Sequence, residues 1–195
     1  MVIRYAALCL AAVLLCLPSP AAAKKKDKQR RSEDAINYSL GVEYTQWLNG
    51  PTFYIATEAE RAEFLSLTSD EAAGAFIADF WKTRDPDPGF FGNKFKELYD
   101  ERLALADRRY REAAVTGRRT DRGVIYVLFG EPDLIRYDST PNPREPDLEV
   151  WNYSGDSEPG LGGEKPNRRY YFAERDGKTV LYTPRASRQR SSRPQ

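Results

Sequence analysis

Six charged or polar residues have side chains that can meet in the fold: Arg84, Asp85, Arg102, Thr120, Asp121 and Arg122. Five of them lie at or beside the ends of predicted elements. Arg102 falls within the apolar stripe of a predicted helix, and an inward-facing arginine is costly unless an acceptor meets it. Asp85 and Asp121, one on each flanking turn, are its predicted partners. The group has three interpretations: a buried ion-pair network that joins the helical half to the sheet, a binding site, or a catalytic site.

Carboxylate chemistry is the sharpest catalytic interpretation. Glycoside cleavage uses two carboxylates about 5–10 Å apart, one as acid and the other as base or nucleophile. Asp85 with Asp121, or Asp121 with Asp133, can supply such a pair for a hydrolase of cell-wall or polysaccharide substrates. Each of these aspartates also has an arginine or a proline turn beside it, which explains it locally. We therefore expect no catalytic residue as the leading interpretation and keep the hydrolase as an alternative.

The composition excludes most other catalytic chemistry. The chain has no histidine, and its two cysteines, Cys9 and Cys16, both lie near the N-terminus. A chain that loses that segment has no Ser-His-Asp triad, no Cys-His dyad, no disulfide and no zinc site built from cysteine or histidine. The sequence shows no phosphate-binding glycine loop and no metal-ligand cluster. We predict no cofactor and no metal.

The two ends of the chain read as segments outside the folded domain. Residues 1–23 have one charge, Arg4, then an apolar run and a small-residue cleavage site ending at Ala23, as expected of a signal peptide. A lipoprotein anchored through Cys16 is the less favoured alternative, because Leu15 before it is large. Residues 24–33 form a charged linker and residues 184–195 a disordered basic tail, which leaves one domain at 34–183. The predicted location is periplasmic or secreted, with no transmembrane segment after signal removal.

The first half of the domain is predicted to be helical. Apolar spacing indicates helices over 34–48, over two segments that begin with capping boxes at Thr57 and Thr68, and over 93–114. The segment 52–55 is predicted to be short and extended. Pro86 ends the third helix.

The second half is predicted to be β. The apolar run 124–129 and residues 134–137 read as a hairpin, with further strands over 148–153, 169–173 and 179–183 and a turn at Asp176-Gly177. Residues 138–147 and 155–167 read as loops. The expected fold is α+β, with an N-terminal helical half of three to four helices packed on a C-terminal antiparallel sheet of about four to five strands.

Several short motifs in one order resemble the GWxTD-domain family, exported proteins of bacteria. The motifs are Trp47-Leu48, Ile55-Ala56-Thr57 with Glu60-Arg61, Phe80-Trp81-Lys82-Thr83-Arg84-Asp85-Pro86-Asp87-Pro88, Asn93, Arg102, Thr120-Asp121-Arg122-Gly123, Tyr126-Val127-Leu128-Phe129-Gly130-Glu131-Pro132-Asp133 and Glu149-Val150-Trp151-Asn152-Tyr153. The tryptophan of the naming motif is Arg118 here. The resemblance implies a location in the cell envelope and implies no established activity.

Large aromatic residues suggest carbohydrate binding as a further possible function, beside the hydrolase and the non-enzymatic module. They are Trp47, Trp81, Trp151, Tyr153, Tyr170, Tyr171 and Phe172. Core positions are favoured for most of them, although alternation along a strand turns at least one ring of 170–172 outward. Without residues 1–23 the chain keeps 29 of its 30 basic residues against 29 acidic ones, which argues against nucleic-acid binding. The leading hypothesis is a non-enzymatic binding or assembly module whose partner is an envelope protein or polysaccharide, contacted through the sheet edge or the loops 138–147 and 155–167.

Overall fold

The computed structural model describes residues 35–139 and 146–183. The predicted signal peptide, the charged linker and the basic tail lie outside these residues, as does most of the loop 138–147. The helices are α2 (Pro51–Ile55), α3 (Glu58–Ser66), α4 (Asp70–Lys82), α5 (Lys94–Arg109), the 3₁₀ helix η1 (Gly117–Arg119) and α6 (Asp121–Phe129). The strands are β1 (Leu134–Asp138), β2 (Leu148–Asn152), β3 (Arg169–Arg175) and β4 (Lys178–Tyr182).

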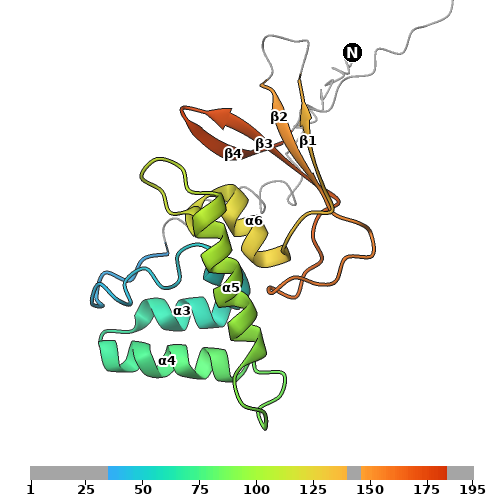
Figure 1. The fold of residues 1–195 in the computed structure, drawn as a ribbon. Coiled ribbons are helices and arrows are strands. Elements are labelled where there is room, and N and C mark those ends of the chain that lie inside the picture. The colour runs from blue at the N-terminus through green and yellow to red at the C-terminus, as the bar shows by residue number, and fades with distance from the viewer. Residues whose placement is uncertain (1–34, 140–145, 184–195) are drawn as a thin grey trace, which may run out of the picture.

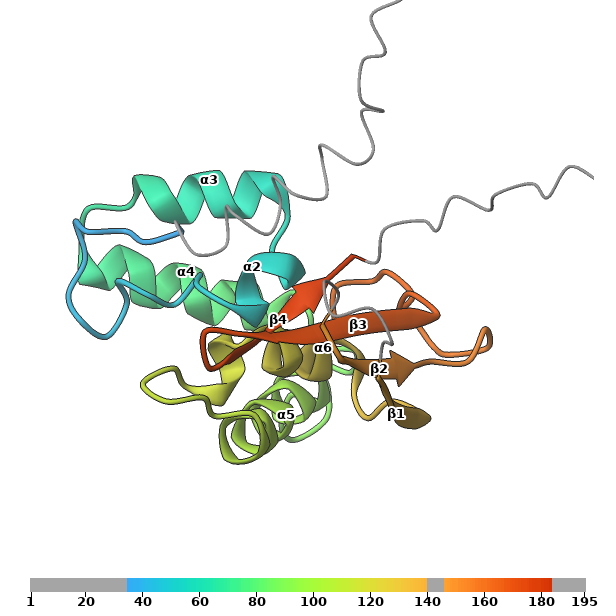
Figure 2. The same cartoon turned by 90° about the horizontal axis from the view of Figure 1, so that it is seen from above.

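The fold is α+β, as predicted, with helices followed by an antiparallel sheet. In the described residues the sheet has four strands in the order β1-β2-β3-β4. Figure 1 shows α3 and α4 side by side at one end of the molecule, the sheet at the other end, and α5 and α6 between them. Seen from above, α6 lies under the sheet (Figure 2). This central helix therefore connects the helical half to the sheet.

The segment 124–129 is a helix, so its predicted hairpin with 134–137 is wrong. Thr120 caps the N-terminus of α6, and Gly130, at φ +80°, ends it. The helix contacts α5 and α2 as well as β4, and Tyr126, Val127 and Leu128 are buried. A helix covered on several faces needs no polar stripe, so its sequence has no 3.6-residue period and resembles a buried strand.

Two further predictions fail near the N-terminus of the domain. The described part of 34–48 is a series of turns and not a helix, and the Thr45 hydroxyl donates to Leu40 O within it at 2.7 Å. The amide of Asn37 donates to Phe64 O and Leu67 O, both at 2.9 Å, and so completes the C-terminus of α3. Residues 52–55, predicted to be extended, lie in α2, with Pro51 in its first turn.

The local signals for helix starts and turns are mostly confirmed. Thr57 forms a capping box with Glu60. The next helix begins one residue later than predicted, with Ser69 and not Thr68 as its N-cap. The residue three positions after Ser69 is Ala72, so this cap has no capping box. The predicted helix 93–114 starts after the Asn93 cap but stops at Arg109. The Asp176-Gly177 turn has two positive φ angles, 53° and 71°, which suit a two-residue hairpin turn.

The predicted core positions of the aromatic residues are largely confirmed. Trp81, Trp151, Tyr153, Tyr170 and Phe172 are all buried, and Trp47 and Tyr171 are partly buried. One aromatic cluster joins Trp47 to Phe64 and Phe80 among the helices, with ring centroids 4.8 and 4.9 Å apart. The core therefore uses rings that were also candidates for sugar stacking.

Candidate functional site

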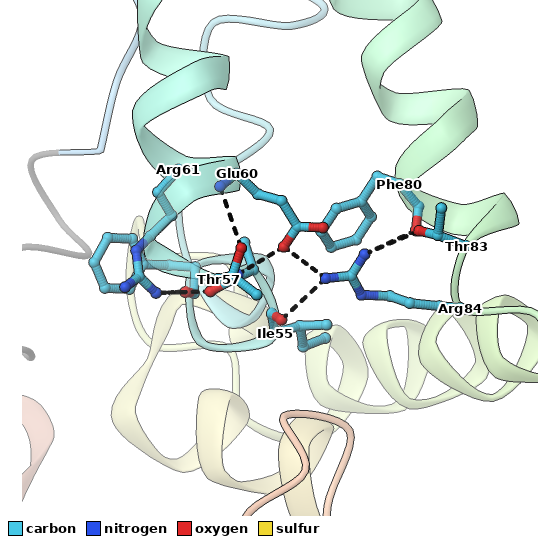
Figure 3. Close-up of polar contacts among 9 residues, drawn as sticks. Ile55, Thr57, Glu60, Arg61, Phe80, Thr83 and Arg84 are labelled. Carbon is cyan, nitrogen blue, oxygen red and sulfur yellow. Dashed lines mark hydrogen bonds and ion pairs between the residues drawn. The ribbon is translucent and has the colours of Figure 1, made fainter.

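Arg84 joins three helices at the end of α4. Its Nη2 donates to the Glu60 carboxylate at 2.7 Å and to Ile55 O at 3.4 Å, while Nη1 donates to Phe80 O at 3.0 Å. Its guanidinium carbon lies 3.6 Å from the centre of the Phe80 ring. Figure 3 shows the guanidinium between Glu60 of α3, the last residue of α2 and the end of α4. The carboxylate partner of Arg84 is therefore Glu60, which is not among the six predicted site residues.

Arg61 acts on the same short helix. Its Nη1 donates to Phe53 O at 2.8 Å and to Ala56 O at 2.7 Å (Figure 3). The last carbonyl groups of a helix have no partner within the helix, and they carry partial negative charge. Two arginines from outside α2 therefore satisfy the C-terminus of a helix only five residues long.

Glu60 is held as a carboxylate. Burial alone raises the pKa of Glu60, but hydrogen bonds from Arg84 and from the backbone and side chain of Thr57, with the Arg84 charge, lower it to about 2. Such a group is ionised at neutral pH and cannot serve there as a general acid. Glu60 therefore serves as a fixed negative charge that pairs with Arg84.

Arg102 meets carbonyl oxygens, not a carboxylate. Its Nη1 donates to Val127 O and Leu128 O, both at 3.2 Å. Burial lowers the pKa of Arg102. A side chain at Gly130 would meet the Arg102 guanidinium at 2.9 Å, so this glycine allows the close approach as well as ending the helix. The predicted partnership with Asp85 or Asp121 is therefore wrong, because the C-terminus of α6 already supplies acceptors.

The Thr120-Asp121-Arg122-Gly123 motif builds the start of α6. The Thr120 hydroxyl donates to Gly117 O at 2.8 Å and accepts from the Gly123 amide at 3.1 Å. A Cβ at Gly123 would lie 1.8 Å from Gly117 O, so only glycine fits there. The Asp121 carboxylate reaches the sheet and accepts the Leu181 amide at 2.5 Å.

Arg122 lies between two glutamates from different parts of the chain. Its Nη2 donates to Glu112 at 2.8 Å and its Nη1 to Glu149 of β2 at 3.0 Å. Glu149 also accepts the Trp151 indole N–H at 2.6 Å, and Glu112 accepts the Thr179 amide at 3.1 Å. The Arg122 side chain is 21% exposed, and its Nε is buried without a hydrogen-bond partner among the described residues. This cluster fixes the start of α6 against the sheet.

Arg118, which stands at the tryptophan position of the naming motif, binds the preceding helix. Its backbone amide donates to Asp107 of α5 at 2.8 Å, and its Nε and Nη2 donate to the same carboxylate at 2.7 and 2.5 Å. Burial raises the pKa of Asp107, but these bonds together lower it. An ion pair thus holds η1 on α5 at this position.

The family model described as GWxTD domain matches residues 35–179. The chain belongs to the GWxTD domain family. No curated protein and no solved structure matches it.

The six predicted site residues do not form one cluster in the GWxTD domain. Arg84 lies at the junction of α2, α3 and α4, whereas Arg102 and the Thr120–Arg122 turn lie at opposite ends of α6. A helix of nine residues is about 13 Å long, so the two ends do not share one site. Asp85 accepts the Asp87 amide at 3.1 Å in the turn after α4.

In this GWxTD domain, the carboxylate partners of Arg84 and Arg122 are not among the six residues predicted from the sequence. Glu60, Glu112 and Glu149 complete the ion pairs of Arg84 and Arg122. Glu60 had a signal, the capping box, and Glu149 lies two residues from Trp151 on the same strand face. Glu112 had none, because it lies after the end of α5 in a turn. Among residues 35–139 and 146–183, no three cysteine or acidic side chains gather as a metal site, and no helix is long and apolar enough to cross a membrane.

Proposed function

We propose that this GWxTD domain is an exported, non-enzymatic module of the cell envelope, periplasmic or secreted, that works by binding another envelope component. The observation that carries the proposal is the β1 edge of the sheet. Tyr137 on this edge is 78% exposed, while the charged residues of the motifs bond to groups within the domain. An unpaired strand edge with an exposed aromatic residue is suited to binding a partner.

Of the predicted contact surfaces, the sheet edge is favoured over the loops 155–167 and 138–147. In the loop 155–167, the Leu161 amide donates to Leu128 O at 3.0 Å, and the Leu161 side chain packs against the core. This loop is therefore fastened to the C-terminus of α6. The loop 138–147 lies mostly outside the described residues.

The aspartates named for hydrolysis have local roles that support a non-enzymatic function. Asp85 accepts the Asp87 amide, Asp121 accepts the Leu181 amide and Asp133 accepts the Ser154 amide at 2.6 Å. A carboxylate engaged in this way organises a turn or a strand edge. No observation of the structure favours the hydrolase or the carbohydrate-binding alternative over the binding module.

Photo-crosslinking in host cells tests the proposal. A photoreactive amino acid at position 137 is expected to give a crosslinked product larger than the chain. The same group at Phe91, which is 99% exposed in the turn before α5, is the control for nonspecific contact. Equal products at both positions, or hydrolysis of purified peptidoglycan that is lost in Asp121→Asn, would contradict the proposal.

A further inference from the structure

The two edge strands of the sheet, β1 and β4, differ in whether side chains of the domain bond to their outward backbone groups. In an antiparallel ladder, alternate residues of an edge strand turn their backbone groups toward the neighbouring strand and away from it. On β4, the outward amides belong to Thr179 and Leu181. Both are covered, the first by the Glu112 carboxylate at 3.1 Å and the second by the Asp121 carboxylate at 2.5 Å. Carboxylates therefore close the β4 edge against another strand.

The same alternation leaves outward groups on β1. The Tyr153 amide bonds to Arg168 O, so residues 149 and 151 of β2 face β3, and residues 148, 150 and 152 face β1. The backbone groups of Ile135 and Tyr137 consequently point away from the sheet. Among the described residues, no donor or acceptor bonds to them. This edge is open over the part of the chain that the structure describes.

The charges on β1 match those of a second copy in one register. A symmetric antiparallel pair in which the outward groups face each other can be centred on any one residue of β1. Centring on Tyr137 places Arg136 opposite Asp138 of the second copy, and Asp138 opposite its Arg136. Centring on Arg136 or on Asp138 places two like charges opposite each other, which is unfavourable, and centring on Leu134 or Ile135 gives no charge pair.

We infer that two copies of this chain pair antiparallel through β1, centred on Tyr137, to form one continuous sheet. The two Tyr137 residues exchange both backbone hydrogen bonds across the two-fold axis, and their rings, exposed in the single chain, contact each other. Two Arg136–Asp138 ion pairs flank this centre on the other face of the sheet. The inference rests on the proposed function in taking the sheet edge as the contact surface, and it names the partner.

Charge exchange tests the register. Light scattering of the purified chain is expected to show a mass that rises from monomer toward dimer with concentration. Arg136→Asp alone and Asp138→Arg alone each place like charges opposite each other, so each weakens the dimer by about 10- to 30-fold. A mixture of these two variants restores both ion pairs and is expected to form a heterodimer. The double variant Arg136→Asp/Asp138→Arg restores the pairs within one chain type.

Controls separate the interface from the fold. Arg136 and Asp138 are both exposed, so neither single variant is expected to change thermal unfolding. Tyr137→Pro removes the outward amide donor and is expected to give a monomer. A wild-type chain that is monomeric up to about 1 mM overturns the inference. So does a dimer that forms equally well with Arg136→Asp. A monomer leaves the crosslinking test of the proposed function standing, because a foreign partner at position 137 is identified there by its mass.

Discussion

Replacing Arg102 with methionine removes the cap from the C-terminus of α6. Methionine keeps most of the apolar stem of the side chain but cannot donate to Val127 O and Leu128 O. Leu128 O keeps the Leu161 amide, so the main loss falls on Val127 O and on the interaction of the cation with the helix end. Hydrogen bonds from charged donors contribute about 1.5–3 kcal/mol each. Because one acceptor keeps a partner, we expect a total loss of about 2–3 kcal/mol in the free energy of unfolding.

Urea unfolding followed by circular dichroism measures this loss. With a slope of about 1–3 kcal/mol per molar urea, the midpoint of Arg102→Met is expected about 1 M below that of the wild type. Arg108→Met on the same helix is the matched control, because Arg108 is exposed, and its change is expected to stay within about 0.5 kcal/mol. Asp121→Asn acts at the other end of α6, so its effect adds to that of Arg102→Met. Equal losses in Arg102→Met and Arg108→Met, or strong coupling between Arg102 and Asp121, would refute the reasoning.

Three further predictions concern single contacts. The pKa of Glu60 is about 2 in the folded chain against an ordinary 4.5, so its contribution to stability is present above about pH 4.5 and is lost as the pH falls toward 2. Glu60→Gln is expected to flatten this part of the curve of unfolding free energy against pH. A curve unchanged by Glu60→Gln would refute the assignment. Gly123→Ala places a Cβ against Gly117 O and is expected to lower the free energy of unfolding by about 3 kcal/mol or more. Gly74→Ala, inside α4 with ordinary contacts, is the control and is expected to raise it by about 0.5–1 kcal/mol. Thermal unfolding measures both changes. Thr120→Ala removes the cap of α6 and is expected to cost about 1–2 kcal/mol, while Thr120→Ser, which keeps the hydroxyl, is expected to retain most of that stability.

The parts of the fold that could be predicted from the sequence are those set by neighbouring residues. The Thr57 capping box, the Asn93 cap and the Asp176-Gly177 turn each depend on three or four adjacent positions. These contacts form within one turn of chain, so their residue types and spacing are visible in sequence. The four strands after residue 133 were found for the same reason, since turn residues separate them.

What could not be predicted depends on contacts between distant segments. The segment 124–129 is a helix because α5 and the sheet cover it, and an apolar run in the sequence does not record that packing. The acceptors of Arg102 are backbone carbonyls, which any residue type supplies, so no sequence pattern marks them. Glu112 meets Arg122 only because the turn after α5 lies beside β4.

The charged residues of the family's motifs hold the fold together, and coupling between Arg122 and Glu149 tests this role most directly. The measurement is a double-mutant cycle on the free energy of unfolding, with Arg122→Met, Glu149→Gln and the double variant. Both side chains are mostly buried, so we expect losses of about 3–5 kcal/mol in each single variant and a double variant about 1–3 kcal/mol short of additive. Unchanged or raised stability in the single variants would contradict the account, because the charges would then be kept at a cost to the fold.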